Sequence, residues 1–162
     1  MINLKYGKKF EIDRIKSTLK KLEWYKANGY RPSLPDSLEE NNFIKEIDKK
    51  FNEEYYKKEG EKLISEYKKA EVDFKKKIKN ILHKDLPEDI DIFVTKYGTG
   101  GLYLPPNRII VNISGNQMNK SPIYVLKHEL IHILVEDEVI KKGLSHKQKE
   151  DLVKSIQEKI EK

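Results

Sequence analysis

The chain contains no cysteine among its 162 residues. Disulfide bonds, thiolate metal ligands and a cysteine nucleophile are therefore excluded, and any metal site has to use histidine and carboxylate side chains. The chain also lacks long apolar runs: no stretch approaches the length of a membrane span, and the N-terminal residues lack the apolar core of a signal peptide. We expect a soluble, cytoplasmic protein without a membrane partner.

The composition is polar for a globular protein, with charged residues and hydrophobic residues each making up 37% of the chain. The length suits one domain with a sizeable core and is too short for two ordinary domains. The net charge of +6 raises the question of nucleic-acid binding. However, the basic runs at residues 57–58 and 75–77 alternate with acidic residues, which is typical of a solvated helix face. We expect no nucleic-acid partner and at most a mild preference for acidic protein surfaces; the oligomeric state is not indicated.

The most informative stretch reads H-E-x-x-H at residues 128–132. Residues four apart lie on the same face of a helix, so His128 and His132 can direct two imidazoles at one metal ion. Glu129 then lies beside the ion without binding it, where it can take a proton from a water molecule. The donor set favours zinc, which accepts neutral imidazole and keeps an open position in catalytic sites. A chance match to this short motif is the competing interpretation.

The flanking residues favour the helix that this chemistry requires. Ser121 followed by Pro122 is typical of a helix start, and Gly143 after two lysines is typical of a helix end. Between them, apolar residues recur at helical spacing: Ile123, Leu126, Leu130, Ile133 and Leu134. The motif is therefore expected in the middle of a helix.

A zinc site needs a third protein ligand, and the next predicted helix supplies candidates. Ser145 and Gln148 form a capping box that places the start of this helix at His146. His146 and Glu150 are four residues apart and share a face, so either of them can be the ligand. If Glu150 binds the metal, His146 can stabilise a developing oxyanion.

Three further residues receive other roles. Glu136 lies two turns beyond His128, too far along the helix to share the ion, so we expect it in solvent or supporting a ligand. Asp151 points about 100° away from Glu150 and is a candidate hydrogen-bond partner for a ligating histidine. His83 follows a different predicted helix, and we expect it at the surface or as a C-terminal cap.

The motif and a glutamate 18 positions after it resemble the gluzincin metallopeptidases, especially the very small ones called minigluzincins. In that group the third ligand is a glutamate on a separate helix, so the resemblance implies that Glu150 completes a site for one Zn²⁺ per chain. The metzincin pattern needs a glycine three residues and a histidine six residues after the second histidine. This chain has Val135 and Glu138 there, which excludes that family. The resemblance covers roughly residues 90–155.

The expected fold class is α+β. Helical periodicity predicts helices over residues 11–28 and 38–82, the second of which Gly60 can break in two. The prolines between these segments suggest a boundary, with residues 1–37 as a helical appendage, a candidate pro-segment, and residues 38–162 as the catalytic core.

Alternating apolar residues predict strands at residues 90–96, 102–104 and 108–113. The resemblance implies a zincin-like arrangement of these elements. It consists of a long backing helix at residues 61–82, a small and mostly antiparallel sheet, an active-site helix and a glutamate helix.

The resemblance implies zinc-dependent hydrolysis of a peptide or protein substrate. Glu129 would be the general base, and His146, or as a weaker candidate Tyr103, would stabilise the oxyanion. A strand before the active-site helix would offer its edge to the extended substrate. The strands at 102–104 and 108–113 are both candidates for that edge. Asn112 and Asn116 are candidates for additional amide contacts.

Two alternatives concern activity. Minimal enzymes of this kind resemble zymogens, which implies that a terminal segment, residues 1–37 or 159–162, can lie in the cleft and keep the protein latent. A different class is a non-enzymatic binding or regulatory protein that keeps zinc for stability. Glu129 favours catalysis over this second class, because a structural site gains little from an acid at that position.

Overall fold

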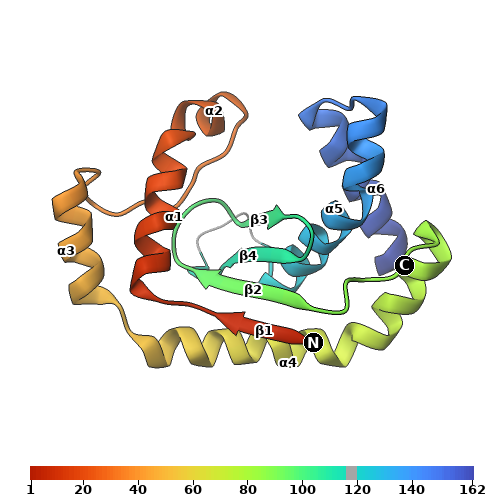
Figure 1. The fold of residues 1–162 in the computed structure, drawn as a ribbon, viewed down its shortest axis with the longest axis horizontal. Helices are drawn as coiled ribbons and strands as arrows, with labels where there is room; N and C mark the ends of the chain where they lie inside the picture. The colour runs from red at the N-terminus through yellow and green to blue at the C-terminus, as the bar shows by residue number, and fades with distance from the viewer. Residues whose placement is uncertain (116–119) are drawn as a thin grey trace.

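The computed structural model describes residues 1–115 and 120–162, and its architecture is α+β (Figure 1). A four-stranded sheet lies between the N-terminal helices on one side and the C-terminal helices on the other. The elements are, in chain order, β1 (Ile2–Lys5), α1 (Lys8–Lys20), α2 (Leu22–Ala27), α3 (Glu40–Lys50), α4 (Glu53–Leu82), β2 (Ile90–Thr95), β3 (Gly101–Leu104), β4 (Arg108–Asn112), α5 (Pro122–Lys142) and α6 (His146–Glu161).

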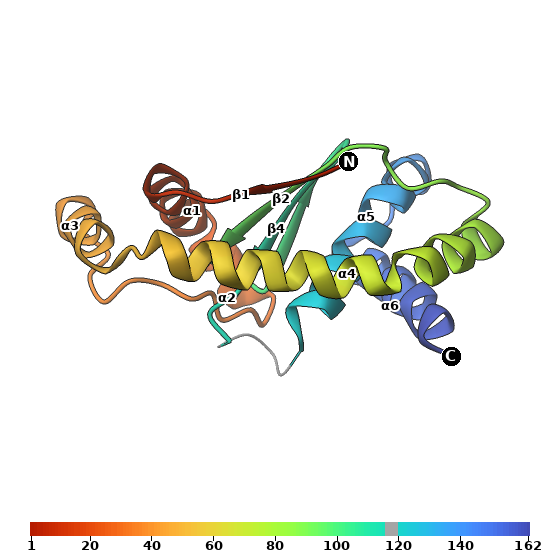
Figure 2. The same ribbon diagram turned by 90° about the horizontal axis from the view of Figure 1, so that it is seen from below.

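The main core forms where α4 and α5 pack against the sheet and α6 packs against these two helices. Ile90, Ile92 and Val94 alternate along β2, so all three are buried on one face of the sheet. The 30-residue α4 runs along the sheet in Figure 2 and contributes Leu63, Tyr67 and several other buried residues to the same core. Within the described ranges, none of the helices is both long enough and apolar enough to cross a membrane.

The sheet corrects the expectation that its strands are mostly antiparallel. The strand order is β1-β2-β4-β3; β1 pairs with β2 and β2 with β4 in parallel, and β3 with β4 is the antiparallel pair. The N-terminal strand, which the sequence pattern missed, is only four residues long. Parallel pairing needs a long connection, and helices α1 to α4 supply it between β1 and β2.

The helices also differ in detail from those that the apolar periodicity predicts. The expected helix over residues 11–28 is interrupted at Lys21, between α1 and α2. The long helical segment divides at Asn52, which caps α4 by accepting a hydrogen bond from the backbone N–H of Tyr55, and not at Gly60. Gly60 lies inside α4, where an added Cβ would lie 2.6 Å from Cδ1 of Leu4. Its missing side chain therefore allows β1 to approach α4 closely.

The N-terminal segment is joined to the rest of the chain by buried polar contacts as well as by β1. Glu11 of α1 is fully buried and accepts hydrogen bonds from the Tyr56 hydroxyl at 2.8 Å and the Lys96 N–H at 3.1 Å. Burial raises the pKa of Glu11 despite these hydrogen bonds. Ile15 of α1 packs with residues of α3 in a second, smaller apolar cluster. The division into residues 1–37 and 38–162 stays a prediction.

The contact between Glu11 and Tyr56 yields a stability prediction. Tyr56→Phe should lower the free energy of unfolding by about 1–3 kcal/mol, because it leaves a buried carboxyl group with one partner fewer. Tyr55→Phe is the matched control: its hydroxyl donates to the Ile113 carbonyl at 3.3 Å in a more exposed position, so the loss should be below about 1 kcal/mol. Urea denaturation of the three proteins measures both values, and equal losses would contradict the prediction.

Candidate metal centre

Helix α5 carries the H-E-x-x-H motif, and local signals set its limits as expected. The Ser121 hydroxyl accepts a hydrogen bond from the backbone N–H of Tyr124, and Pro122 is the first helical residue. Gly143 ends the helix in the left-handed region at φ 61°. The apolar side chains of α5 pack in the core. The helix is therefore largely buried, and the His132 side chain is 2% exposed and the His128 side chain 16% exposed.

Helix α6 follows after a short turn and runs back along α5. The Ser145–Gln148 capping box that the sequence predicts is present, with both reciprocal hydrogen bonds formed. Val153, Ile156 and Ile160 of α6 are buried in the main core. This packing places the face of α6 that carries Glu150 against the two histidines.

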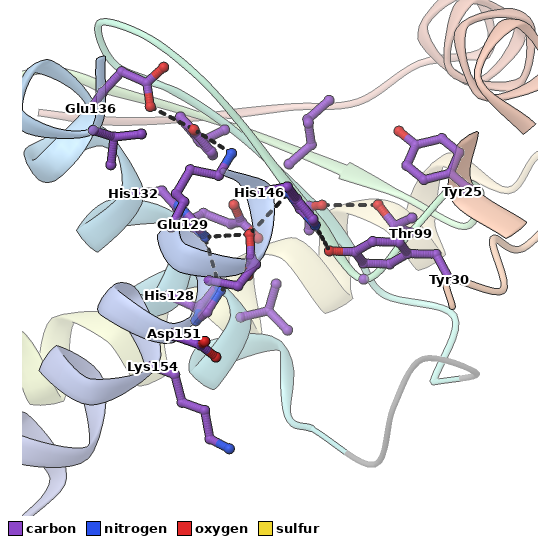
Figure 3. Close-up of a pocket in the computed structure, with 18 of the residues that line it drawn as sticks. Tyr25, Tyr30, Thr99, His128, Glu129, His132, Glu136, His146, Asp151 and Lys154 are labelled. Atoms are coloured by element: carbon purple, nitrogen blue, oxygen red, sulfur yellow. Dashed lines mark hydrogen bonds and ion pairs between the residues drawn. The ribbon is translucent and has the colours of Figure 1, made fainter. Parts of the chain in front are cut away.

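Ligand atoms of His128, His132 and Glu150 converge within 4.8 Å of one another. Figure 3 labels the two histidines of this cluster. The two Nε2 atoms of the histidines are 3.1 Å apart. Glu150 reaches both rings, with Oε2 3.3 Å from Nε2 of His128 and Oε1 3.3 Å from Nε2 of His132. Burial opposes the ionisation of Glu150, but its contacts with the two histidines outweigh this effect and hold its pKa below the ordinary value.

These atoms fit a zinc ion in both chemistry and spacing. Two imidazole nitrogens and one carboxylate are the donor set of many catalytic zinc sites. Ligand atoms about 2.0–2.1 Å from a tetrahedral zinc lie roughly 3.3–3.4 Å from each other. The two Nε2 atoms, 3.1 Å apart, are close to this value, and each lies 3.3 Å from a different carboxylate oxygen of Glu150. The three side chains, with one ligand atom each, could therefore hold one ion.

A glutamine that the sequence reasoning missed orients the first histidine. Nδ1 of His128 lies 2.8 Å from Oε1 of Gln157, an oxygen that can only accept, so Nδ1 carries the proton and Nε2 presents its lone pair to the cluster. The amide nitrogen of Gln157 donates to the Tyr124 carbonyl, which fixes the amide orientation. Asp151, the expected partner, is exposed, so that expectation was wrong. Gln157 lies two turns after Glu150, and this spacing on one helix face is the signal that could have identified it.

The second histidine is held by stacking. Its ring lies parallel to the Tyr103 ring, with centroids 4.7 Å apart and an interplanar angle of 4°. The Tyr103 hydroxyl donates to Oε2 of Glu136 at 2.6 Å and accepts from Nζ of Lys149 at 3.1 Å. Glu136 therefore supports a ligand, as expected, by holding the tyrosine that packs on His132. The Tyr103 hydroxyl is occupied by these two partners.

Glu129 lies between α5 and the first residue of β3. The side chain is 7% exposed, and a Cβ added to Gly101 would lie 2.3 Å from its Oε1 atom. Glycine at position 101 is thus required for α5 and β3 to lie this close with a carboxylate between them. Burial raises the pKa of Glu129 to about 7, with the charge of His128 acting in the opposite direction. A carboxylate with this pKa can accept a proton and release it again near neutral pH.

His146 lies at the opening of the site and contacts the N-terminal segment. Its Nε2 atom lies 2.8 Å from the Tyr30 hydroxyl, and its Nδ1 atom lies 4.0 Å from Oε1 of Glu150. Burial raises the pKa of Tyr30 to about 12, so its hydroxyl is protonated at neutral pH and can donate to the imidazole or accept from it, depending on the tautomer of His146. Trp24 also contacts the His146 ring, edge to face. The sequence pattern did not predict the contacts of Tyr30 and Trp24 with His146.

The cluster lies in a cavity of about 780 Å³. Figure 3 shows His128, Glu129 and His132 on one side of this cavity and Tyr30 with His146 on another. Residues of α1, α2 and the loop after α2 form part of its wall, whereas residues 159–162 do not line it. Whether a terminal segment keeps the protein latent stays a prediction.

Two further candidate residues, Asn112 and His83, do not line the cavity that holds the cluster. The Asn112 amide donates to the Gly98 carbonyl at 3.2 Å and its oxygen accepts from the Ser114 N–H, so it stabilises the turn after β4. Asn116 lies outside the described residues. His83 is exposed and caps α4 in the left-handed region at φ 56°, as expected. Neither Asn112 nor His83 contributes a ligand atom to the cluster.

Comparisons of the chain with protein-family models, with curated proteins and with solved structures found no match. The similarity to gluzincins in the motif and the downstream glutamate therefore stays a resemblance. The interpretation of the site rests on the positions and chemistry of its own side chains.

The role of Glu150 as a ligand can be tested directly. Glu150→Ala should weaken zinc binding roughly 100-fold or more, because it removes one of three ligand atoms. Asp151→Ala changes the adjacent, exposed carboxylate and should retain one zinc per chain. Elemental analysis of the proteins purified side by side is the measurement. A full complement of zinc in Glu150→Ala would transfer the ligand role to His146.

The hydrogen bond to Gln157 leads to a second prediction about affinity. Gln157→Met should weaken zinc binding by roughly 10–100-fold, because Nδ1 of His128 loses the acceptor that orients the ring. Gln157→Glu keeps an oxygen at the same position and should retain most of the affinity. Competition with a chromogenic chelator measures the difference. Unchanged affinity in Gln157→Met would mean that the hydrogen bond does not orient the ligand.

Proposed function

We propose that this protein is a zinc-dependent metallopeptidase of the gluzincin type. The observation that carries the proposal is the convergence of His128, His132 and Glu150 beside a buried Glu129 in one large cavity. A structural zinc site does not need a carboxylic acid next to its ligands, whereas hydrolysis needs a group that moves protons. The combination therefore favours catalysis over a purely structural role.

In this proposal His128, His132 and Glu150 hold the zinc. When bound, zinc supplies a Lewis acid that polarises a carbonyl group and lowers the pKa of water. A carboxylate oxygen of Glu129 takes the proton from the attacking water and later donates it to the leaving nitrogen. The raised pKa of Glu129, about 7, suits both transfers because neither protonation state is strongly favoured near neutral pH.

The substrate is an extended peptide that lies along β3. This strand is at the edge of the sheet, and its residues Leu102 and Tyr103 line the cavity. β4 is paired on both sides, with β2 and with β3, so the expectation that residues 108–113 offer a free edge was wrong. Main-chain groups of residues 101–104 are then the ones that hold the peptide next to Glu129.

His146 is the donor that we assign to the developing oxyanion. Its imidazole lies at the opening of the site, and the Tyr30 hydroxyl occupies its Nε2 atom in the described structure. Donation to substrate therefore uses Nδ1, or requires that Tyr30 gives up its contact. Tyr103 is a poorer donor because its hydroxyl is held by Glu136.

Glu129→Gln separates catalysis from metal binding. The variant should retain one zinc per chain and lower kcat by roughly 10²–10⁴-fold, because the amide cannot accept the proton. Cleavage of a quenched fluorescent peptide library, with zinc content measured on the same samples, tests this expectation. If the variant cuts as fast as the wild type, Glu129 is not the base. If zinc-loaded wild type cuts no peptide, the alternative of a zinc-stabilised binding or regulatory protein is supported instead.

A further inference from the structure

The cavity above the candidate metal centre has a rim of lysines, Lys20, Lys21, Lys120, Lys149 and Lys154. They come from both of its walls: the end of α1 and the residue after it on one side, and α6 with Lys120, two residues before α5, on the other. Figure 1 shows the α1–α2 unit and α6 standing on opposite sides of β3. In the described part of the chain, no carboxylate forms an ion pair with any of the five. Lys149 already donates to the Tyr103 hydroxyl, whereas the other four lysines are exposed and their charges are available to a ligand.

The acidic residues of the cavity are less accessible than these lysines. Glu129 is 7% exposed, and Glu150 faces the two histidines of the cluster. Glu136 accepts a hydrogen bond from Tyr103. Asp151 is the exposed acid that remains, and the lysines outnumber it. A ligand that enters the cavity therefore meets positive charge at the rim before it reaches the cluster.

We propose that the cleft selects acidic peptide segments, with aspartate or glutamate side chains on both sides of the residue bound at the cluster. This inference rests on the proposed function in that the ligand is a peptide lying along β3. A peptide in that position passes between the two walls, with Lys20 and Lys21 on one side and Lys154 on the other. Each exposed ion pair contributes little alone, but several charges of one sign around a cleft attract an oppositely charged ligand.

Peptide binding tests this inference separately from cleavage. The probes are a fluorescein-labelled peptide rich in glutamate and matched peptides with glutamine or lysine at the same positions. The protein is the Glu129→Gln variant with zinc supplied, so that the peptides stay intact. Fluorescence anisotropy should show about tenfold tighter binding of the glutamate peptide than of the glutamine peptide. The difference should shrink as salt is added.

Charge-reversal variants locate the effect. Lys20→Glu combined with Lys21→Glu, and separately Lys154→Glu on the opposite wall, should each reduce the preference for glutamate. Lys57→Glu combined with Lys58→Glu is the matched control for the Lys20/Lys21 double variant, because these exposed lysines of α4 lie outside the cavity and the net charge changes by the same amount. The control should keep the preference.

The outcomes distinguish this inference from the proposed function. Equal binding of the glutamate and glutamine peptides, equal losses in the Lys57/Lys58 control, or no binding of any peptide would overturn it. Selective binding of the glutamate peptide, without cleavage of any peptide by zinc-loaded wild type, would support acidic selection and overturn the proposed hydrolysis.

Discussion

A carboxylate and two imidazoles meet where α5 packs against α6, and the removal of such groups from water costs free energy unless each is paired or binds a cation. The Glu150 carboxylate pairs with both imidazoles, since each Nε2 atom lies 3.3 Å from one of its two oxygens. The rest of the site depends on this contact. It requires that α6 runs back along α5, that Gly143 allows the turn between them, and that Gln157 and Tyr103 orient the two rings.

The sheet contributes a second constraint, the close approach of β3 to α5. Glycine at position 101 leaves room for the Glu129 side chain, and the loop before it is held from the N-terminal side. There, Arg14 of α1 is buried and donates to the Thr99 hydroxyl at 3.4 Å, and Thr99 donates to the Gly101 carbonyl at 3.0 Å. Helix α1 thus supports the strand that carries the proposed substrate edge. The N-terminal segment is connected to the site physically, through the loop before β3 and through the contact of Tyr30 with His146.

The positive rim and the negative interior of the cavity have different physical origins. The interior carboxylates are surrounded by histidines and a tyrosine, so their charges are compensated locally. The lysines at the rim are mostly exposed and are compensated by water. A net positive cavity mouth above the proposed zinc site is the arrangement that would attract an acidic peptide.

The sequence alone predicted the features that depend on neighbouring residues. The ends of α5 follow from Ser121 and Gly143, and the start of α6 follows from the capping box at Ser145, because each signal acts within one helical turn. The alignment of His128 and His132 follows from helix geometry in the same way. Glu150 was identified only because the resemblance to gluzincins favoured it over His146, since both share one helix face.

The tertiary structure decided the features that join distant segments. The parallel pairing of β1 with β2 connects residues 88 positions apart, such as Ile2 and Ile90, and no local pattern specifies such a partner. The contacts of Gln157 with His128 and of Tyr30 with His146 are likewise products of packing, which brings side chains together according to the burial of the apolar faces around them. The sequence determined which helices form and which groups they can present. Only the burial of those helices against the sheet determined which of these groups meet, and it placed the lysines of α1 and α6 on opposite walls of one cavity.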